Sequence, residues 1–202
     1  MDKNLLQKSA IELRKLITNK DISPVELTKL SLERIEEIDQ KTNCFITVTP
    51  ENAIKAAKKI EDKILKGKKL GKMVGIPTSI KDLEPVKGVR MTKGSLSFEK
   101  VIADQDQICV ERIKNEDGII LGKTNCSEFG HSGTNENKLS DDTRNPWNLD
   151  FTSGASSGGA GVSVLTSVNT VAQASDGGGS TRIPASFCGL YGMIGTTGRI
   201  PR

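Results

Sequence analysis

The stretch "MVGIPTSIKDL", residues 73–83, is a short apolar run with β-branched residues that ends on a lysine and an aspartate. Short runs of this kind, bounded by turn residues, are typical of buried strands. A second run, "GIILGKTN" at residues 118–125, follows directly after "ICVERIKNED" at residues 108–117, where apolar side chains recur at helical spacing. Because a helix separates two strands, these segments predict an α/β fold with a buried sheet.

The residues before this run predict helices. Three segments have apolar side chains at intervals of three and four residues: 4–20, 23–39 and 51–69. In the second of them, Ser23 stands where an N-cap is needed and Pro24 occupies the first helical position. We therefore expect a mainly helical region over residues 1–70 and a catalytic core over residues 71–202, within one truncated domain.

The composition limits the classes of function. Lysine and arginine number 29 against 25 acidic residues, a formal charge of +4. The lysines alternate with acids and aromatic residues make up only 3%, a pattern that favours solvated helix faces over direct contact with nucleic acid. No apolar run approaches the roughly 20 residues that span a membrane. The sequence thus predicts a globular protein that contacts neither membranes nor nucleic acids directly.

The four cysteines are widely spaced and form no CxxC pair. This spacing argues against a zinc site, and no signal peptide opens the chain. We expect free thiols, no bound metal and a cytoplasmic location.

Two glycine-rich motifs contain candidate nucleophiles. The first, "GASSGG" at residues 154–159, matches the G-x-S-x-G pattern of α/β-hydrolases at Ser156. In those enzymes a histidine base follows the serine in the chain, whereas the single histidine, His131, precedes it. A Ser-His-Asp triad is therefore not expected, and a structural turn that opens a helix is an equal alternative for this motif alone.

The second motif is "SDGGGSTRIPASFCG", residues 175–189, where three glycines precede Ser180. Consecutive glycines are costly to order, but their N–H groups can surround an oxyanion without steric hindrance. A serine beside such a pocket can attack the carbonyl whose oxygen the pocket binds. The alternative is a purely structural glycine turn.

A lysine can replace the missing histidine as a base if burial keeps it neutral. Lys81 ends the apolar run that opens this section, so its side chain can project from a buried strand. Desolvation lowers a lysine pKa from about 10.4 towards 7–8, where the amine accepts a proton at neutral pH. Taken alone, Lys81 fits an ordinary lysine at the end of a strand better than a base.

The three motifs together resemble the amidase signature family. "GIPTSIKDL", "GASSGGAG" and "SDGGGSTRIPASFCG" occur in the order of that family, supported by "LGKTNCSEFG", "GTNEN" and "TRNPWNLD". The resemblance implies an amidase-signature fold, a mixed β-sheet flanked by helices, of which this chain is an incomplete N-terminal portion. Family members are about twice as long, so the missing half would supply further strands and much of the substrate pocket.

The resemblance also implies roles for single residues. Ser180 matches the acylated nucleophile and Lys81 the general base. Ser156 matches the serine that a cis peptide joins to its neighbour and that bridges nucleophile and base. Gly130 is a candidate substrate-binding residue. No metal or organic cofactor is implied. The expected oxyanion donors are the backbone amides of Gly177, Gly178, Gly179 and Ser180.

Three functions follow, in order of preference. The first is hydrolysis of a small or aryl carboxamide to carboxylate and ammonia or amine through a Ser-Ser-Lys triad. The second is the amidase subunit of a glutamyl-tRNA amidotransferase, which the sequence also resembles and which would pass ammonia to partner subunits. The third is a truncated fragment without catalysis. Expected partners are a small-molecule amide and either a missing C-terminal half or a second copy of the chain.

Overall fold

The computed structural model describes residues 3–201. Its N-terminal region contains the 3₁₀ turn η1 (Lys3–Gln7) and the helix α1 (Ala10–Thr18), where the sequence predicts one helix over 4–20. The break occurs at Ser9, whose side chain accepts the Glu12 N–H while the Glu12 carboxylate accepts the Ser9 N–H. This reciprocal capping box starts a new helix, so the expected single helix is wrong at this point.

The next two helices agree with the sequence pattern. Helix α2 (Pro24–Thr42) begins behind Ser23, whose side chain accepts two backbone N–H groups, and ends at Asn43 in the left-handed conformation. Helix α3 (Pro50–Leu65) is followed by a turn at Gly67, where φ is +62°. Caps and turns of this kind terminate helices because they satisfy the free backbone groups.

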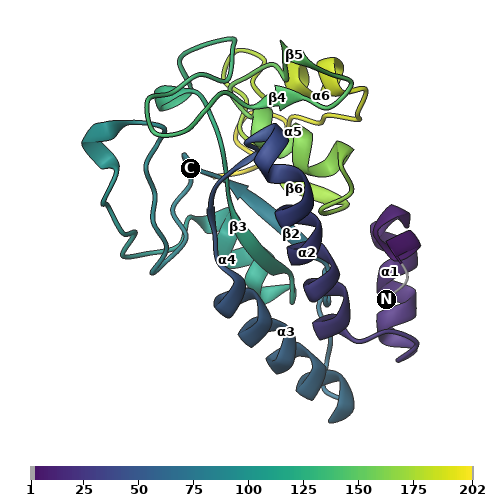
Figure 1. The fold of residues 1–202 in the computed structure, drawn as a ribbon. Coiled ribbons are helices and arrows are strands. Elements are labelled where there is room, and N and C mark those ends of the chain that lie inside the picture. Colours follow the sequence, from purple (N-terminus) through teal and green to yellow (C-terminus); the bar gives the residue numbers. More distant parts are fainter. Residues whose placement is uncertain (1–2, 202) are drawn as a thin grey trace.

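The main sheet has the strand order β1-β3-β2-β6 among the described residues. Figure 1 labels β2, β3 and β6 of this sheet near the centre of the molecule. Strands β2 (Pro77–Lys81) and β3 (Ile119–Thr124) lie parallel to one another, and β6 (Val171–Gln173) lies parallel to β2. Strand β1 (Phe45–Val48) is antiparallel to β3. The two predicted strands are confirmed, and the mixed sheet that the family resemblance implies is present.

Helices cover both faces of this sheet. On one face, α1, α2 and α3 form a core with Ile119 and Leu121 of β3, and Val162 of α5 (Gly158–Leu165) joins it. On the other face Ile80 of β2 and Ile120 of β3 pack in one cluster with Val110 of α4 (Ile108–Asn115). Alternate residues of β3 thus serve different cores, as the two-residue period of a strand requires.

The Gly-, Ser- and Asn-rich part of the chain folds over the carboxyl end of the sheet. It contains η3 (Glu128–Gly130), the hairpin of β4 (Arg144–Asn145) and β5 (Asn148–Thr152), and α6 (Arg182–Cys188). A short turn, η2 (Leu96–Phe98), precedes α4.

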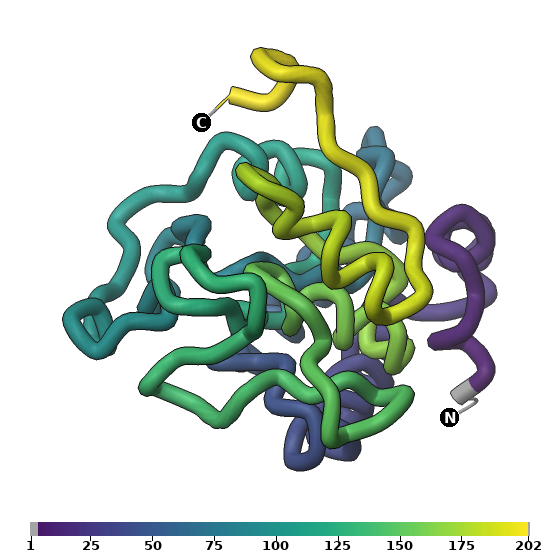
Figure 2. The backbone as a smooth tube through the Cα atoms, turned by 90° about the horizontal axis from the view of Figure 1, so that it is seen from above, coloured from purple at the N-terminus to yellow at the C-terminus, as the bar shows by residue number. Residues whose placement is uncertain are grey.

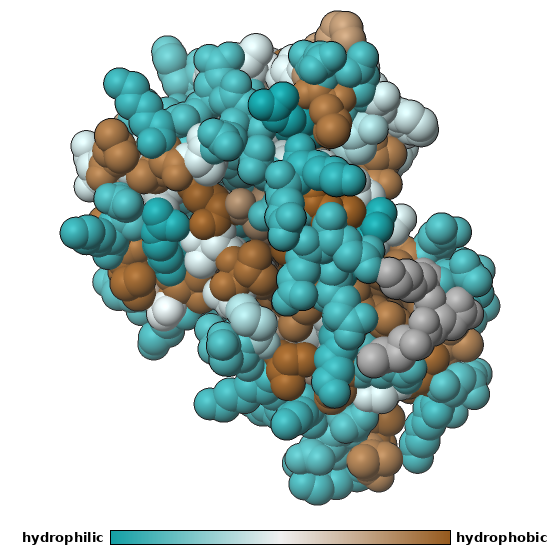
Figure 3. Space-filling view, viewed as in Figure 1, coloured by the Kyte–Doolittle hydropathy of each residue, from teal (hydrophilic) through white to brown (hydrophobic). Residues whose placement is uncertain are grey.

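The last described residues run along the outside of the molecule (Figure 2). Tyr191 and Met193 of this segment are exposed, and so are Trp147 and Phe151 of the β4–β5 hairpin. On the face drawn in Figure 3, apolar residues are visible between the hydrophilic ones.

Gly159 is expected to be intolerant of any side chain. A Cβ atom built there would lie 2.3 Å from the Cys44 carbonyl oxygen and 2.6 Å from the Asn125 nitrogen, both backbone atoms. Gly159→Ala should lower the free energy of unfolding by about 3 kcal/mol, since this overpacking cannot relax without backbone movement. Urea unfolding measures it. Gly133→Ala, where nothing lies within 4 Å, is the control; equal stability of both variants would contradict the prediction.

Candidate active site

Lys81 lies at the carboxyl end of β2 and is completely buried. Its Nζ is 2.7 Å from Ser156 Oγ and 3.0 Å from Ser175 Oγ. The Lys81 backbone N–H donates to the Gln173 side chain of β6 at 3.0 Å, which ties the end of β2 to its neighbour. The amine is therefore held against two hydroxyl groups inside the protein.

Burial lowers the pKa of Lys81 from its ordinary 10.5 to about 8, and the nearby groups of Cys126, Glu84 and Asp176 oppose this shift. Desolvation disfavours the charged ammonium, and no carboxylate forms an ion pair with it among the described residues. A neutral amine can donate a hydrogen bond to one hydroxyl and accept one from another. Lys81 can thus take up a proton near neutral pH.

Ser156 stands in the loop between β5 and α5, after a cis peptide bond that joins it to Ala155. Gly130 lies against its side chain: a Cβ atom at Gly130 would be 3.1 Å from Ser156 Oγ and 2.9 Å from Leu83 Cδ1. Gly130 also has a φ of +70°, which glycine adopts at little cost. Its lack of a side chain leaves space beside the Ser156 hydroxyl.

The loop that contains Ser180 is joined to the residue after Ser156. The Ser157 N–H donates to the Ser180 carbonyl at 3.2 Å, and Ser157 Oγ donates to the Ser175 carbonyl at 3.3 Å. Ser180 is half-buried, and its hydroxyl makes no hydrogen bond within residues 3–201. The fold therefore brings both serine motifs to the end of the strand that bears Lys81.

Asp176 holds the glycine loop in shape. Its carboxylate accepts the N–H groups of Gly179, Thr181 and Arg182 at 2.8, 3.2 and 3.3 Å, and the Arg182 guanidinium binds both of its oxygens. The Asp176 side chain is 2% exposed. The hydrogen bond from Arg182 is the main cause that holds the pKa of Asp176 well below its usual range.

Loss of the Asp176 charge should disorder this loop. We expect Asp176→Asn to slow the reaction of Ser180 with a fluorophosphonate by about tenfold to a hundredfold. An asparagine amide has one accepting oxygen, so it cannot accept hydrogen bonds from both the backbone N–H groups and Arg182 as a carboxylate does. The reaction rate, followed by intact mass, checks this. Asp104→Asn, at an exposed position outside the loop, is the matched control, and unchanged labelling of Asp176→Asn would refute the role.

The three glycines among the four expected oxyanion donors differ in their surroundings. Gly177 and Gly178 are exposed, and no described residue accepts their N–H groups. The Gly179 N–H donates to Asp176, and its φ is +122°. The loop thus presents two free amides, and the third is already hydrogen-bonded.

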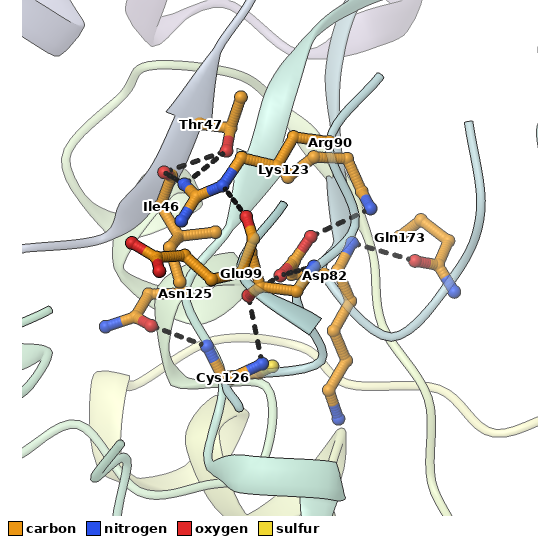
Figure 4. A network of polar contacts seen from close by, with 12 residues as sticks. Ile46, Thr47, Asp82, Arg90, Glu99, Lys123, Asn125, Cys126 and Gln173 are labelled. Atoms are coloured by element: carbon orange, nitrogen blue, oxygen red, sulfur yellow. Dashed lines mark hydrogen bonds and ion pairs between the residues drawn. The ribbon is translucent and has the colours of Figure 1, made fainter. Parts of the chain in front are cut away.

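A buried ion pair lies beside Lys81 in the sequence. Lys123 of β3 donates to Asp82 at 3.0 Å, and both side chains are fully buried. Thr92 donates to the other Asp82 oxygen through its N–H, at 2.9 Å, and through its hydroxyl. Figure 4 shows this pair near Cys126. Burial is the main cause that lowers the pKa of Lys123, and Asp82 opposes it.

Arg90 extends the polar network of Figure 4 towards β1. It donates to the Glu99 carbonyl at 2.6 Å and to the Ile46 carbonyl at 3.2 Å. This anchors the long segment between β2 and α4 against the sheet.

The described residues contain neither a metal-binding cluster nor a membrane-spanning helix. No group of three or more histidine, cysteine or acidic residues there is arranged to bind a metal. None of the helices within residues 3–201 is both long and apolar enough to cross a membrane.

The comparisons with known proteins give the family. A family model described as Amidase matches residues 26–202. The chain belongs to the amidase family. It is 42% identical over 199 residues to the A subunit of the glutamyl-tRNA(Gln) amidotransferase of Clostridium botulinum, an alignment that covers 98% of this chain and 41% of the relative. This amidase chain thus spans less than half the length of the curated relatives it matches.

Solved amidases have the same fold. A bacterial aryl acylamidase of the amidase signature family superposes with a TM-score of 0.85 at 36% identity, over 88% of this chain and 37% of that one. The 6-aminohexanoate cyclic dimer hydrolase superposes with a TM-score of 0.83 at 31% identity, over 91% of this chain and 37% of that one. The expected amidase-signature fold, present as an N-terminal portion, is confirmed.

The motifs in the sequence led to part of this site. Lys81 and Ser156 are in contact, Gly130 lies against Ser156, and the Ser180 loop adjoins them. Two interactions were not predicted from the sequence: the contact of Ser175 with Lys81, and the hydrogen bonds of the Asp176 carboxylate to the glycine loop. Ser175 and Asp176 both belong to the motif at residues 175–189. The buried Asp82–Lys123 pair was missed too, and its signal was a charge at the end of each apolar run.

Proposed function

We propose that this amidase cleaves a carboxamide C–N bond through an acyl-enzyme on Ser180. The observation that carries the proposal is the 2.7 Å contact between the buried Lys81 amine and Ser156 Oγ. A lysine whose pKa lies near neutral pH can exchange a proton with a neighbouring hydroxyl. Burying an amine without an acidic partner costs free energy, and perturbed groups of this kind are concentrated at functional sites. The hydrogen bond from Ser157 to Ser180 supports placing the nucleophile next to this relay.

In the proposed reaction Ser180 Oγ attacks the carbonyl carbon of the amide. Its proton passes to Ser156, whose own proton passes to the Lys81 amine. Collapse of the tetrahedral intermediate breaks the C–N bond, and the same relay returns a proton to the departing nitrogen. Water then attacks the ester, which releases the carboxylate and restores the Ser180 hydroxyl.

The oxyanion of the intermediate would be bound by backbone amides of the glycine loop. Gly177, Gly178 and Ser180 supply donors, and the Gly179 N–H is shared between the oxyanion and Asp176. One donor of this kind contributes about 2.7–4 kcal/mol to transition-state stabilisation. Gly130, beside Ser156 Oγ, leaves room for the substrate carbonyl.

The comparisons favour one branch of the family for the substrate. Curated relatives at 41–42% identity are A subunits of glutamyl-tRNA(Gln) amidotransferases, whereas the aryl acylamidase is 36% identical. This supports the second expected function over the first: a primary carboxamide as substrate, with ammonia passed to partner subunits. Because relatives extend well beyond this length, we propose that the remaining portion completes the substrate pocket; a homodimer stays a prediction.

The test uses a fluorophosphonate on the purified protein, followed by intact mass and peptide mapping. We expect one adduct on Ser180, lost in Ser180→Ala and strongly slowed in Ser156→Ala. Ser186→Ala, at an exposed position of α6, is the control. An adduct on Ser156 would overturn the assigned roles.

The absence of any adduct would favour the third expected function, a fragment without catalysis. If the adduct forms on Ser180, ammonia release from glutamine, compared with amine release from an aryl anilide, separates the two enzymatic functions. Turnover of the anilide alone would refute the amidotransferase branch.

A further inference from the structure

A large cleft lies away from the candidate active site, between α3, the C-terminal end of α4 and the segment around residues 86–89. Its volume is about 1030 Å³. None of the residues assigned above to the catalytic relay or to the glycine loop contributes to its walls. The proposed amide hydrolysis therefore does not account for it.

The walls of this cleft are strongly basic. They include seven lysines against two aspartates, a net charge of +5, whereas the whole chain carries only +4. Lys63 binds Asp117 at 2.6 Å and Lys114 binds Asp106 at 2.7 Å. The lysines without an acidic partner among the described residues are Lys55, Lys59, Lys66, Lys68 and Lys87. So much unbalanced charge in one place creates a field that attracts anions.

The floor of the cleft is apolar. It is formed by aliphatic side chains of α3, β3 and the segment after β2: Ala56, Ile60, Val86, Val89 and Ile120. An aliphatic floor under a basic rim matches a ligand that is apolar on one side and acidic on its flanks. A helix about 10 Å across would fill this volume over about two and a half turns.

We propose that this cleft binds an acidic amphipathic helix of a protein partner. Leucine-type side chains of that helix would enter the aliphatic floor, and its glutamates or aspartates would pair with the five lysines of the rim. Nucleic acid fits less well, because the lining contains neither arginine nor an aromatic residue for base stacking. The proposal is independent of the amide chemistry, so its test requires no enzymatic activity.

The test uses a fluorescent synthetic peptide of 18 residues with leucines on one helical face and glutamates beside them. Fluorescence anisotropy with the purified protein should show saturable binding that weakens as the salt concentration rises. A peptide of the same composition in scrambled order should bind at least tenfold more weakly. Equal binding of both peptides, or no binding of the first, would overturn the proposal.

Matched variants locate the binding. The double substitution Lys55→Glu, Lys59→Glu, at exposed positions of α3, should weaken binding about tenfold through loss and reversal of two charge contacts. Ala56→Phe, which adds bulk to the floor from a half-buried position, should also weaken it. The control carries Lys41→Glu and Lys100→Glu, equally exposed but outside the cleft.

Circular dichroism checks that every variant stays folded. An RNA 20-mer serves as the competing probe. RNA that binds more tightly than the peptide and responds to the same α3 variants would overturn the assignment to a protein helix, as would a control that weakens peptide binding equally.

Discussion

Replacing Lys81 with methionine should slow acylation of Ser180 by about a thousandfold at pH 8, within the range for removal of a general base. Methionine has similar length and suits a buried site, but it cannot accept the proton that passes through Ser156. The second-order rate of fluorophosphonate labelling measures the effect. Lys100→Met, at an exposed position, is the control, and near-normal labelling of Lys81→Met would rule out the relay.

The pH dependence of labelling and of stability tests the neutral Lys81 amine independently. Because the pKa of Lys81 is lowered to about 8, labelling should rise about tenfold per pH unit below pH 8 and level off above it. Stability should also change: between about 8 and 10.5 the unfolded chain binds the additional proton, so stability rises with pH across this window. Lys81→Met should lack both effects; a wild-type protein with a flat profile would refute the neutral amine.

Breaking the buried Asp82–Lys123 pair should destabilise the protein by about 3–5 kcal/mol, because either single substitution leaves an uncompensated charge inside. Lys123→Met leaves Asp82 with only its bonds from Thr92. Asp82→Leu leaves a buried ammonium without its carboxylate. Urea unfolding of both variants measures the loss.

The double variant Asp82→Leu, Lys123→Met is the decisive comparison. It removes both charges together, so it should be more stable than either single variant, as the desolvation cost of the pair also disappears. If the two single losses simply add, the charges do not depend on one another and the prediction fails.

The strands and most helices could be predicted because local rules produced them. Ser23 with Pro24 marked the start of α2, and the apolar runs at 73–83 and 118–125 became β2 and β3. The strand β1 was missed because "FITV" is only four residues long and gains its stability from pairing with β3. The break at Ser9 was missed because the apolar spacing continues through a capping residue.

For the candidate site, the sequence by itself determined the chemical groups: a lysine at the end of an apolar run, two serines and three glycines. Only the tertiary structure decided which of them meet. Lys81 and Ser156 are 75 positions apart, and their contact depends on α5 packing against the sheet. The low pKa of Lys81 likewise has no local cause, since burial by distant segments produces it. Contact and desolvation are properties of the folded chain, and they convert a common lysine into a candidate base.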